Sequence, residues 1–163
     1  MPKELFLIRH AETENPELGL KDIDRQLTAD GEIESSKIGK FLSKLVNDPD
    51  LVLSSTSQRT RQTVGLIAEQ LQCNPSNIDY QEDLYESSTR ILLRVINSML
   101  EKNEKVIVVG HNPSITFLAE YITGAEIGSV SPAGIVHIKN EGSWAEITQN
   151  SSDLVQYYDP SML

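Results

Sequence analysis

The sequence has very little of what disulfides, metal sites and membrane spans are built from. Cys73 is the only cysteine in 163 residues, so no disulfide can form within the chain and no cysteine spacing suggests a metal site. No stretch approaches the roughly 18 consecutive apolar residues of a membrane-spanning helix. The apolar run at 5–8 is also too short for the core of a signal peptide. These absences favour a cytoplasmic protein that does not associate with a membrane.

Positive charge is also scarce. The 14 lysines and arginines face 24 aspartates and glutamates, which gives a net charge of −10. Such a chain is not expected to bind nucleic acid or anionic lipid through its overall field. If the ligand is an anion, its charge must be met by a local cationic pocket.

The composition is that of an ordinary globular protein, with 39% hydrophobic and 23% charged residues. The length suits one domain, which we place at residues 1–163. Three short apolar runs, typical of buried strands, each lead into residues suited to an anionic ligand. These runs are 5–8 before Arg9 and His10, 51–53 before Arg59, and 106–109 before His111. Since ligands bind beyond the carboxyl ends of strands in open α/β sheets, the three runs predict one shared site.

Helical patterns alternate with these runs. Helices are expected from Thr28 to about residue 46, from about 56 to 72, from about 88 to 102, and from an Asn112 N-cap and Pro113 to a stop at Gly124. Residues 78–80 suit a short edge strand. Residues 134–138 and 143–147 predict a hairpin turning at 140–142, and little regular structure is expected after Asn150. The order indicates a three-layer α/β/α fold with a mostly parallel, mixed central sheet and a C-terminal hairpin.

Two imidazoles and two guanidinium groups fit the chemistry of phosphoryl transfer. Neutral imidazole is nucleophilic at physiological pH without a separate base, which suits His10 as nucleophile and His111 as a second imidazole. Arg9 and Arg59 can clamp phosphoryl oxygens with planar, bidentate forks. Attack requires an unprotonated nitrogen, so we expect the other ring nitrogen of His10 to donate to a backbone carbonyl.

Three motifs carry a resemblance to a known family. Residues 9–13 (Arg-His-Ala-Glu-Thr) resemble the Arg-His-Gly signature of the histidine phosphatase superfamily, which includes phosphoglycerate mutases. Residues 55–63, with Ser55, Arg59 and a Gln-Thr pair, resemble its second motif, and residues 109–113 its third. The small size, residues 24–28 and Trp144 narrow the resemblance to the SixA-like phosphohistidine phosphatases. It covers nearly the whole chain, in the family's order.

The resemblance implies a covalent phosphohistidine on His10, phosphoryl oxygens held by Arg9, Arg59 and His111, and release of phosphate by water, with no metal or organic cofactor. Two departures are visible. Ala11 replaces the usual glycine, so its backbone must avoid positive φ. Asn15 lies one position short of the asparagine that mutase-like members use for phosphate.

Glu86 aligns with the position where larger relatives keep a general acid. An acid matters for a poor leaving group such as an alkoxide, and much less for the imidazole of a phosphohistidine. Two enzymatic interpretations therefore stay open. One is a metal-independent phosphatase of a phosphohistidine-bearing protein, such as a phosphotransfer domain. The other is a phosphatase of phosphorylated small molecules that uses Glu86 as acid.

A third interpretation is a phosphate-binding module without catalysis, which the complete set of core residues disfavours. Arg25 and Arg61 are interpreted as structural, with Arg25 pairing with Asp22 or Asp24. His137 is interpreted as an ordinary surface or sheet histidine, on the strand face opposite its neighbours.

Overall fold

A six-stranded sheet, in the order β3-β2-β4-β1-β5-β6, forms the centre of the computed structural model, which describes residues 2–16 and 19–163. Strands β1 to β4 pair in parallel, whereas β5 runs antiparallel to β1 and β6. The strands are β1 (Lys3–Arg9), β2 (Leu51–Ser54), β3 (Ile78–Tyr80), β4 (Lys105–Gly110), β5 (Ile135–Asn140) and β6 (Asp153–Tyr158). The mixed, mostly parallel sheet and the edge strand at 78–80 are as predicted.

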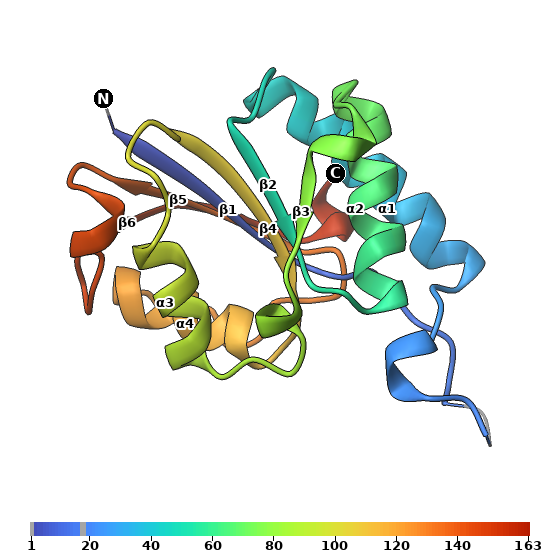
Figure 1. Cartoon of the computed structure of the whole chain (residues 1–163). Helices are drawn as coiled ribbons and strands as arrows, with labels where there is room; N and C mark the ends of the chain where they lie inside the picture. Colours follow the sequence, from blue (N-terminus) through green and yellow to red (C-terminus); the bar gives the residue numbers. More distant parts are fainter. Residues whose placement is uncertain (1, 17–18) are drawn as a thin grey trace.

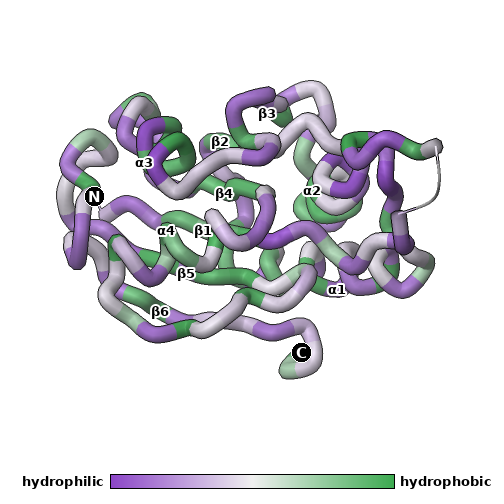
Figure 2. The backbone as a smooth tube through the Cα atoms, turned by 90° about the horizontal axis from the view of Figure 1, so that it is seen from below, coloured by the Kyte–Doolittle hydropathy of each residue, from purple (hydrophilic) through white to green (hydrophobic). Residues whose placement is uncertain are grey.

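Helices cover both faces of this sheet, which confirms the three-layer fold (Figure 1). Helices α1 (Ala29–Leu45) and α2 (Gln58–Leu71) lie on one face, and α3 (Thr89–Asn97) and α4 (Ser114–Thr123) lie on the other. Successive side chains of a strand point to opposite faces. Phe6 and Ile8 of β1 therefore pack with α1 and α2, whereas Leu5 and Leu7 pack with α3 and α4. Figure 2 shows hydrophobic stretches along the central strands and largely hydrophilic outer loops.

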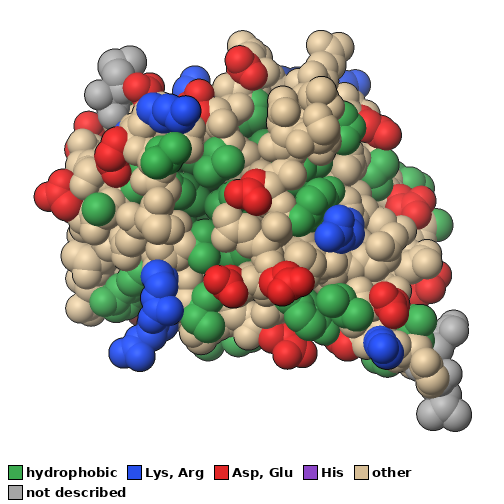
Figure 3. All heavy atoms as spheres, in the orientation of Figure 1, with side chains coloured by type: hydrophobic (Ala, Val, Ile, Leu, Met, Phe, Trp, Pro, Cys, Tyr) green, Lys and Arg blue, Asp and Glu red, His purple; other side chains and the backbone are tan. Residues whose placement is uncertain are grey.

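The surface matches the acidic composition. Acidic side chains are spread over the face shown in Figure 3, in a chain whose net charge is −10. Within residues 2–16 and 19–163, no helix combines the length and the apolar character that crossing a membrane would take.

Side-chain caps start the helices where the sequence predicts. The hydroxyl of Thr28 accepts a 2.9 Å hydrogen bond from the backbone N–H of Gly31 at the start of α1. Ser57 and Ser88 cap α2 and α3 in the same way. Gly124 ends α4 in the left-handed conformation, with φ of 75°.

Two helix boundaries differ from the prediction. Helix α4 begins at Ser114, and Asn112 lies before the N-cap position, although its side-chain oxygen accepts from the backbone N–H of Thr116 at 3.3 Å. Helix α3 ends at Asn97 instead of continuing to about 102. The chain turns there because Met99 packs into the core and the following residues must reach β4.

The C-terminal hairpin is present, but its second strand lies elsewhere. Residues 144–146 form a short 3-10 helix, and the strand paired with β5 is β6, in the tail for which the sequence predicts little regular structure. The cause is Trp144, whose fully buried side chain packs with residues of α3 and α4 and whose Nε1 donates to the Asn103 carbonyl at 2.6 Å. A turn carries this large ring into the core, and β6 pairs with β5 as a partly exposed edge strand.

Replacing Trp144 with alanine tests this account of the hairpin. The expected loss of unfolding free energy is about 3–5 kcal/mol, because the substitution removes a fully buried aromatic side chain and leaves a cavity. Urea unfolding followed by far-UV circular dichroism measures it. Ile33→Ala, at a position on α1 that is 67% exposed, is the control and should change stability by no more than about 0.5 kcal/mol. A loss below about 1 kcal/mol for Trp144→Ala would contradict the account.

Candidate active site

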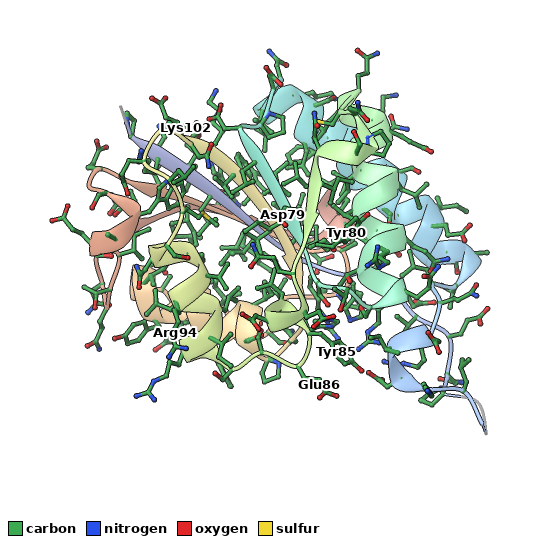
Figure 4. The ribbon with its side chains drawn as sticks, viewed as in Figure 1. Asp79, Tyr80, Tyr85, Glu86, Arg94 and Lys102 are labelled. Carbon is green, nitrogen blue, oxygen red and sulfur yellow. The ribbon has the colours of Figure 1, made fainter. Side chains whose placement is uncertain are left out.

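The carboxyl ends of β1, β2 and β4 meet at one edge of the sheet. In the register of the sheet, Arg9 lies opposite Gly110 and Ser54 lies opposite Val109. A cavity of about 370 Å³ opens there, lined by Arg9, His10, Thr13, Arg25, Arg59, Glu86, His111 and Asn112. The five residues singled out from the sequence, Arg9, His10, Arg59, Glu86 and His111, therefore line a single cavity. Figure 4 shows Glu86 and neighbouring Tyr85 at this end of the sheet and Lys102 near the opposite end.

His10 is held with one ring nitrogen against the backbone. Its Nδ1 lies 2.8 Å from the carbonyl oxygen of Ala11. A carbonyl can only accept, so Nδ1 carries the proton and Nε2 keeps its lone pair. This confirms the hydrogen bond predicted for His10. Burial lowers the pKa of His10 from 6.5 to about 4, and the positive charges of Arg59 and Arg9 act in the same direction.

His111 meets His10 edge to face, with ring centroids 5.3 Å apart. Its Nε2 lies 2.8 Å from the hydroxyl oxygen of Ser55, the residue that follows β2. Burial, together with the neighbouring His10 and Arg59, lowers the pKa of His111 from 6.5 to about 3. Both imidazoles are therefore neutral near pH 7.

Local hydrogen bonds fix the segment that carries Arg9 and His10. The backbone N–H of Ala133 lies 3.1 Å from the carbonyl oxygens of both residues, and the N–H of Ala11 donates to the Thr63 hydroxyl at 3.1 Å. Ala11 is fully buried and is absent from the described residues with positive φ. The alanine in place of the family's usual glycine is therefore compatible with the backbone at this point.

The three arginines of the cavity leave hydrogen-bonding capacity unused. The buried Nε atoms of Arg9, Arg25 and Arg59 make no hydrogen bond in the described part of the chain, although that of Arg25 lies 3.3 Å from an Asp22 carboxylate oxygen as an ion pair. The Arg9 Nη1 donates to the Val130 carbonyl at 3.0 Å, and both terminal nitrogens of Arg59 donate to Asp22. Unpaired buried donors are rare. Their concentration in one cavity indicates a site suited to an anion with several acceptor oxygens.

Arg25 and Asp22 belong to this site more closely than the sequence suggests. Arg25 pairs with Asp22 as predicted, Nε to Oδ1 at 3.3 Å, but it also lines the cavity. Tyr85 was not singled out from the sequence, yet its hydroxyl donates to the Asp22 carboxylate at 2.6 Å and its ring lies edge-on to His111. A lone arginine and a tyrosine in polar loops carry no periodic signal, so only the fold reveals them.

The remaining basic residues lie outside the cavity. Arg61 stacks on the ring of Tyr80 at 4.1 Å and donates to the Thr56 carbonyl, which fits the structural role predicted for it. His137 is buried, stacks on Phe6 and lies 2.9 Å from the Glu4 carboxylate. It is a sheet histidine of the core. In the described part of the chain, no three side chains of His, Cys, Asp or Glu gather into a group that could hold a metal ion.

Comparison with known protein families identifies the family of this chain. Residues 5–92 match the family model of the histidine phosphatase superfamily, branch 1. The chain belongs to this superfamily. This histidine phosphatase is therefore a hydrolase that removes phosphoryl groups, and its fold agrees with those of solved structures.

Similar proteins span most of the same length. An uncharacterized protein of Mycobacterium tuberculosis is 29% identical, over 94% of this chain and 99% of its own. A chloroplastic protein of Arabidopsis thaliana is also 29% identical, but this histidine phosphatase spans only 61% of it. The crystal structure of a protein from Agrobacterium tumefaciens described as a putative phosphohistidine phosphatase SixA superposes with a TM-score of 0.84, at 25% identity, over 98% of this chain and 99% of the other. A SixA structure with bound tungstate superposes with a TM-score of 0.83 at 18% identity, over 98% of each chain.

The lowered pKa of His10 predicts how stability depends on pH. Between about pH 4 and 6.5, the unfolded chain binds a proton at His10 that the folded chain does not bind. The free energy of unfolding should therefore fall as the pH drops through this window, by up to about 1.4 kcal/mol per pH unit for each such histidine. Urea unfolding at several pH values, compared between the wild type and His10→Asn, measures the His10 share. The variant should lose less stability on acidification, and parallel curves for the two proteins would contradict the prediction.

Proposed function

We propose that this histidine phosphatase is a metal-independent phosphohistidine phosphatase that works through a covalent phosphohistidine on His10. One observation carries the proposal. Two neutral imidazoles and three arginines line one cavity, and the buried Nε atoms of Arg9 and Arg59 have no partner in the described part of the chain. This set supplies a nucleophile and preorganised cations for the phosphoryl oxygens.

In the first step, the lone pair on Nε2 of His10 attacks phosphorus. A P–N bond to His10 forms while the P–N bond of the substrate breaks. The leaving imidazole takes a proton from solvent, which reaches the cavity beside exposed Glu86. The phosphorylated ring of His10 keeps its Nδ1–H on the Ala11 carbonyl. It is therefore cationic and a good leaving group.

In the second step, water attacks the phosphorus of phosphorylated His10, orthophosphate leaves, and Nε2 recovers its lone pair. Arg9 and Arg59 neutralise charge on the equatorial oxygens in both steps. The Nε2 atom of His111 is hydrogen-bonded to the Ser55 hydroxyl. Its Nδ1 is therefore the ring nitrogen left to contact a phosphoryl oxygen. No step calls for a metal ion.

Support for a protein substrate comes from chemistry and from similarity. Imidazole is a better leaving group than an alkoxide and needs less help from a general acid. Several solved structures with the same fold are described as phosphohistidine phosphatases. The partner that we propose is a protein bearing phosphohistidine, such as a phosphotransfer domain.

Substitutions in the cavity test this mechanism. His10→Ala should abolish hydrolysis of a phosphohistidine protein, because nothing replaces the covalent nucleophile. Arg59→Ala should raise the barrier by about 2–4 kcal/mol, the size seen when a preorganised donor is removed. Single-turnover release of labelled phosphate, with excess EDTA present, measures both effects.

Arg61→Ala is the matched control for Arg59→Ala, because Arg61 is exposed on the same helix and lies outside the cavity. It should keep turnover within about threefold of the wild type, since surface substitutions away from a site have small effects. Turnover of His10→Ala within tenfold of the wild type, or loss of activity in EDTA, would overturn the proposal.

A phosphatase of small phosphate esters is the second candidate, and the position of Glu86 favours it. Glu86 lines the cavity and adopts a left-handed backbone conformation with φ of 54°. For a residue other than glycine this costs about 1–3 kcal/mol and often marks a functional site. A carboxylic acid here could protonate an alkoxide leaving group.

Glu86→Gln separates the two candidates. If the enzyme acts mainly on phosphohistidine, kcat/KM for a phosphohistidine protein should change by less than about threefold, because imidazole leaves without a strong acid. Hydrolysis of alkyl phosphates should be slow in the wild type and fall further in the variant. Fast alkyl phosphate hydrolysis that Glu86→Gln abolishes would favour the ester phosphatase instead.

A further inference from the structure

Asp22 contacts two of the three arginines that line the cavity, Arg25 and Arg59. Its carboxylate accepts from Arg59 Nη2 at 3.1 Å and from the Tyr85 hydroxyl at 2.6 Å, and it pairs with Arg25 at 3.3 Å. Its backbone carbonyl accepts from Arg59 Nη1 at 2.8 Å. One residue therefore joins the loop after β1, the first turn of α2 and the segment before α3.

We propose that Asp22 is a positioning residue, which sets the orientation of the Arg59 guanidinium group without touching the phosphoryl group itself. The inference rests on the proposed function, in which Arg59 clamps phosphoryl oxygens. It goes further because it names the loop carboxylate that orients the Arg59 guanidinium group.

The donors of Arg59 support this role. A guanidinium group has five N–H donors, and the hydrogen bonds that Arg59 makes within the described chain use only one on each terminal nitrogen, both to Asp22. The other three, Nε–H among them, have no protein acceptor there. Two contacts at the outer end of the fork fix its plane, while the remaining donors stay available to a ligand.

Burial makes the contact more than a surface ion pair. The Arg59 side chain is 7% exposed, whereas that of Asp22 is 50% exposed. An exposed pair contributes little, but a buried cation that loses its only partner is left uncompensated and must move or bind another anion. Arg59 depends on Asp22 far more than Asp22 depends on Arg59.

Tyr85 keeps the carboxylate in place. Burial and the bond to Asp22 raise the pKa of Tyr85 to about 12, so the hydroxyl stays a donor at neutral pH. The same bond, together with Arg59, lowers the pKa of Asp22, so the carboxylate stays an acceptor. The Arg59 guanidinium also lies 5.9 Å from the centre of the Tyr85 ring. Tyr85 and Asp22 thus hold Arg59 from two directions.

Activity measurements on three variants begin the test. Asp22→Ala should lower kcat/KM for a phosphohistidine protein about 10- to 100-fold, mostly through kcat. Asp22→Asn should recover most of it, because the amide oxygen can still accept from Arg59 and Tyr85. Asp24→Ala is the matched control: Asp24 is exposed in the same short 3-10 helix, does not line the cavity, and should leave activity unchanged.

Histidine titration by NMR supplies a second measurement, in which loss of the Asp22 charge and displacement of the Arg59 cation change the pKa of His10 in opposite directions. Removing the negative charge of Asp22 can only lower the pKa of a nearby histidine, whereas displacement of the Arg59 cation raises it. The groups around His10 are Arg9, Arg25, Arg59, His111 and Glu86. The pKa of His10 should therefore rise in Asp22→Ala and should not rise in Asp22→Asn or Asp24→Ala.

The outcomes separate this inference from the proposed function. A His10 pKa that is unchanged or lower in Asp22→Ala would overturn the positioning role, as would equal activity of Asp22→Ala and Asp24→Ala. A wild type that hydrolyses neither phosphohistidine proteins nor phosphate esters would instead refute the proposed function. The titration needs no turnover, so it would still decide the role of Asp22.

Discussion

The site depends on one constraint, which is that three positively charged arginine side chains lie close together in a partly buried cavity. Arg9, Arg25 and Arg59 line one cavity, and the guanidinium groups repel one another more strongly there than they would in bulk water. The fold tolerates this because a buried sheet holds the ends of β1, β2 and β4 together, while the Val130 carbonyl and Asp22 occupy part of the donors. The rest of the positive charge is best met by an anion with several oxygens, which is what a phosphoryl group presents.

Burial and the same positive charge together set the protonation state of the two histidines. Burial removes His10 and His111 from water, and the neighbouring arginines disfavour a further positive charge. Both rings therefore stay neutral, and His10 needs no general base to become a nucleophile. Outside the cavity the chain is strongly acidic. A phosphoryl group is therefore attracted only by the cavity. The overall negative charge of the protein does not attract extended polyanions such as nucleic acids.

Much of the fold can be predicted from local sequence patterns, namely apolar runs and helix-capping residues. The apolar run before Arg9 and His10 must be a strand because its side chains fill both faces of the sheet. Thr28 and Gly124 mark helix ends through backbone chemistry that acts within a few residues. Parallel strands bring their carboxyl ends to one edge, so the sequence alone groups Arg9, His10, Arg59 and His111 in one site. The position of Glu86 at the cavity followed from motif similarity.

Other features follow only from contacts between distant segments. The ring of Trp144 packs with core residues of α3 and α4. Residues 144–146 therefore form a 3-10 helix although their sequence pattern is typical of a strand. Residues 153–158 include Val155, Tyr157 and Tyr158, which favour strands, but only pairing with β5 selects this segment over 143–147 as the second strand of the hairpin. Arg25, Asp22 and Tyr85 reach the cavity from loops that have no periodic pattern. The sequence by itself therefore determined strands β1 to β5, the helix caps and the catalytic candidates, whose signals are local. The tertiary structure alone decided the second strand of the hairpin and the partners that orient Arg59, since these arise from packing and charge pairing across long separations in the chain.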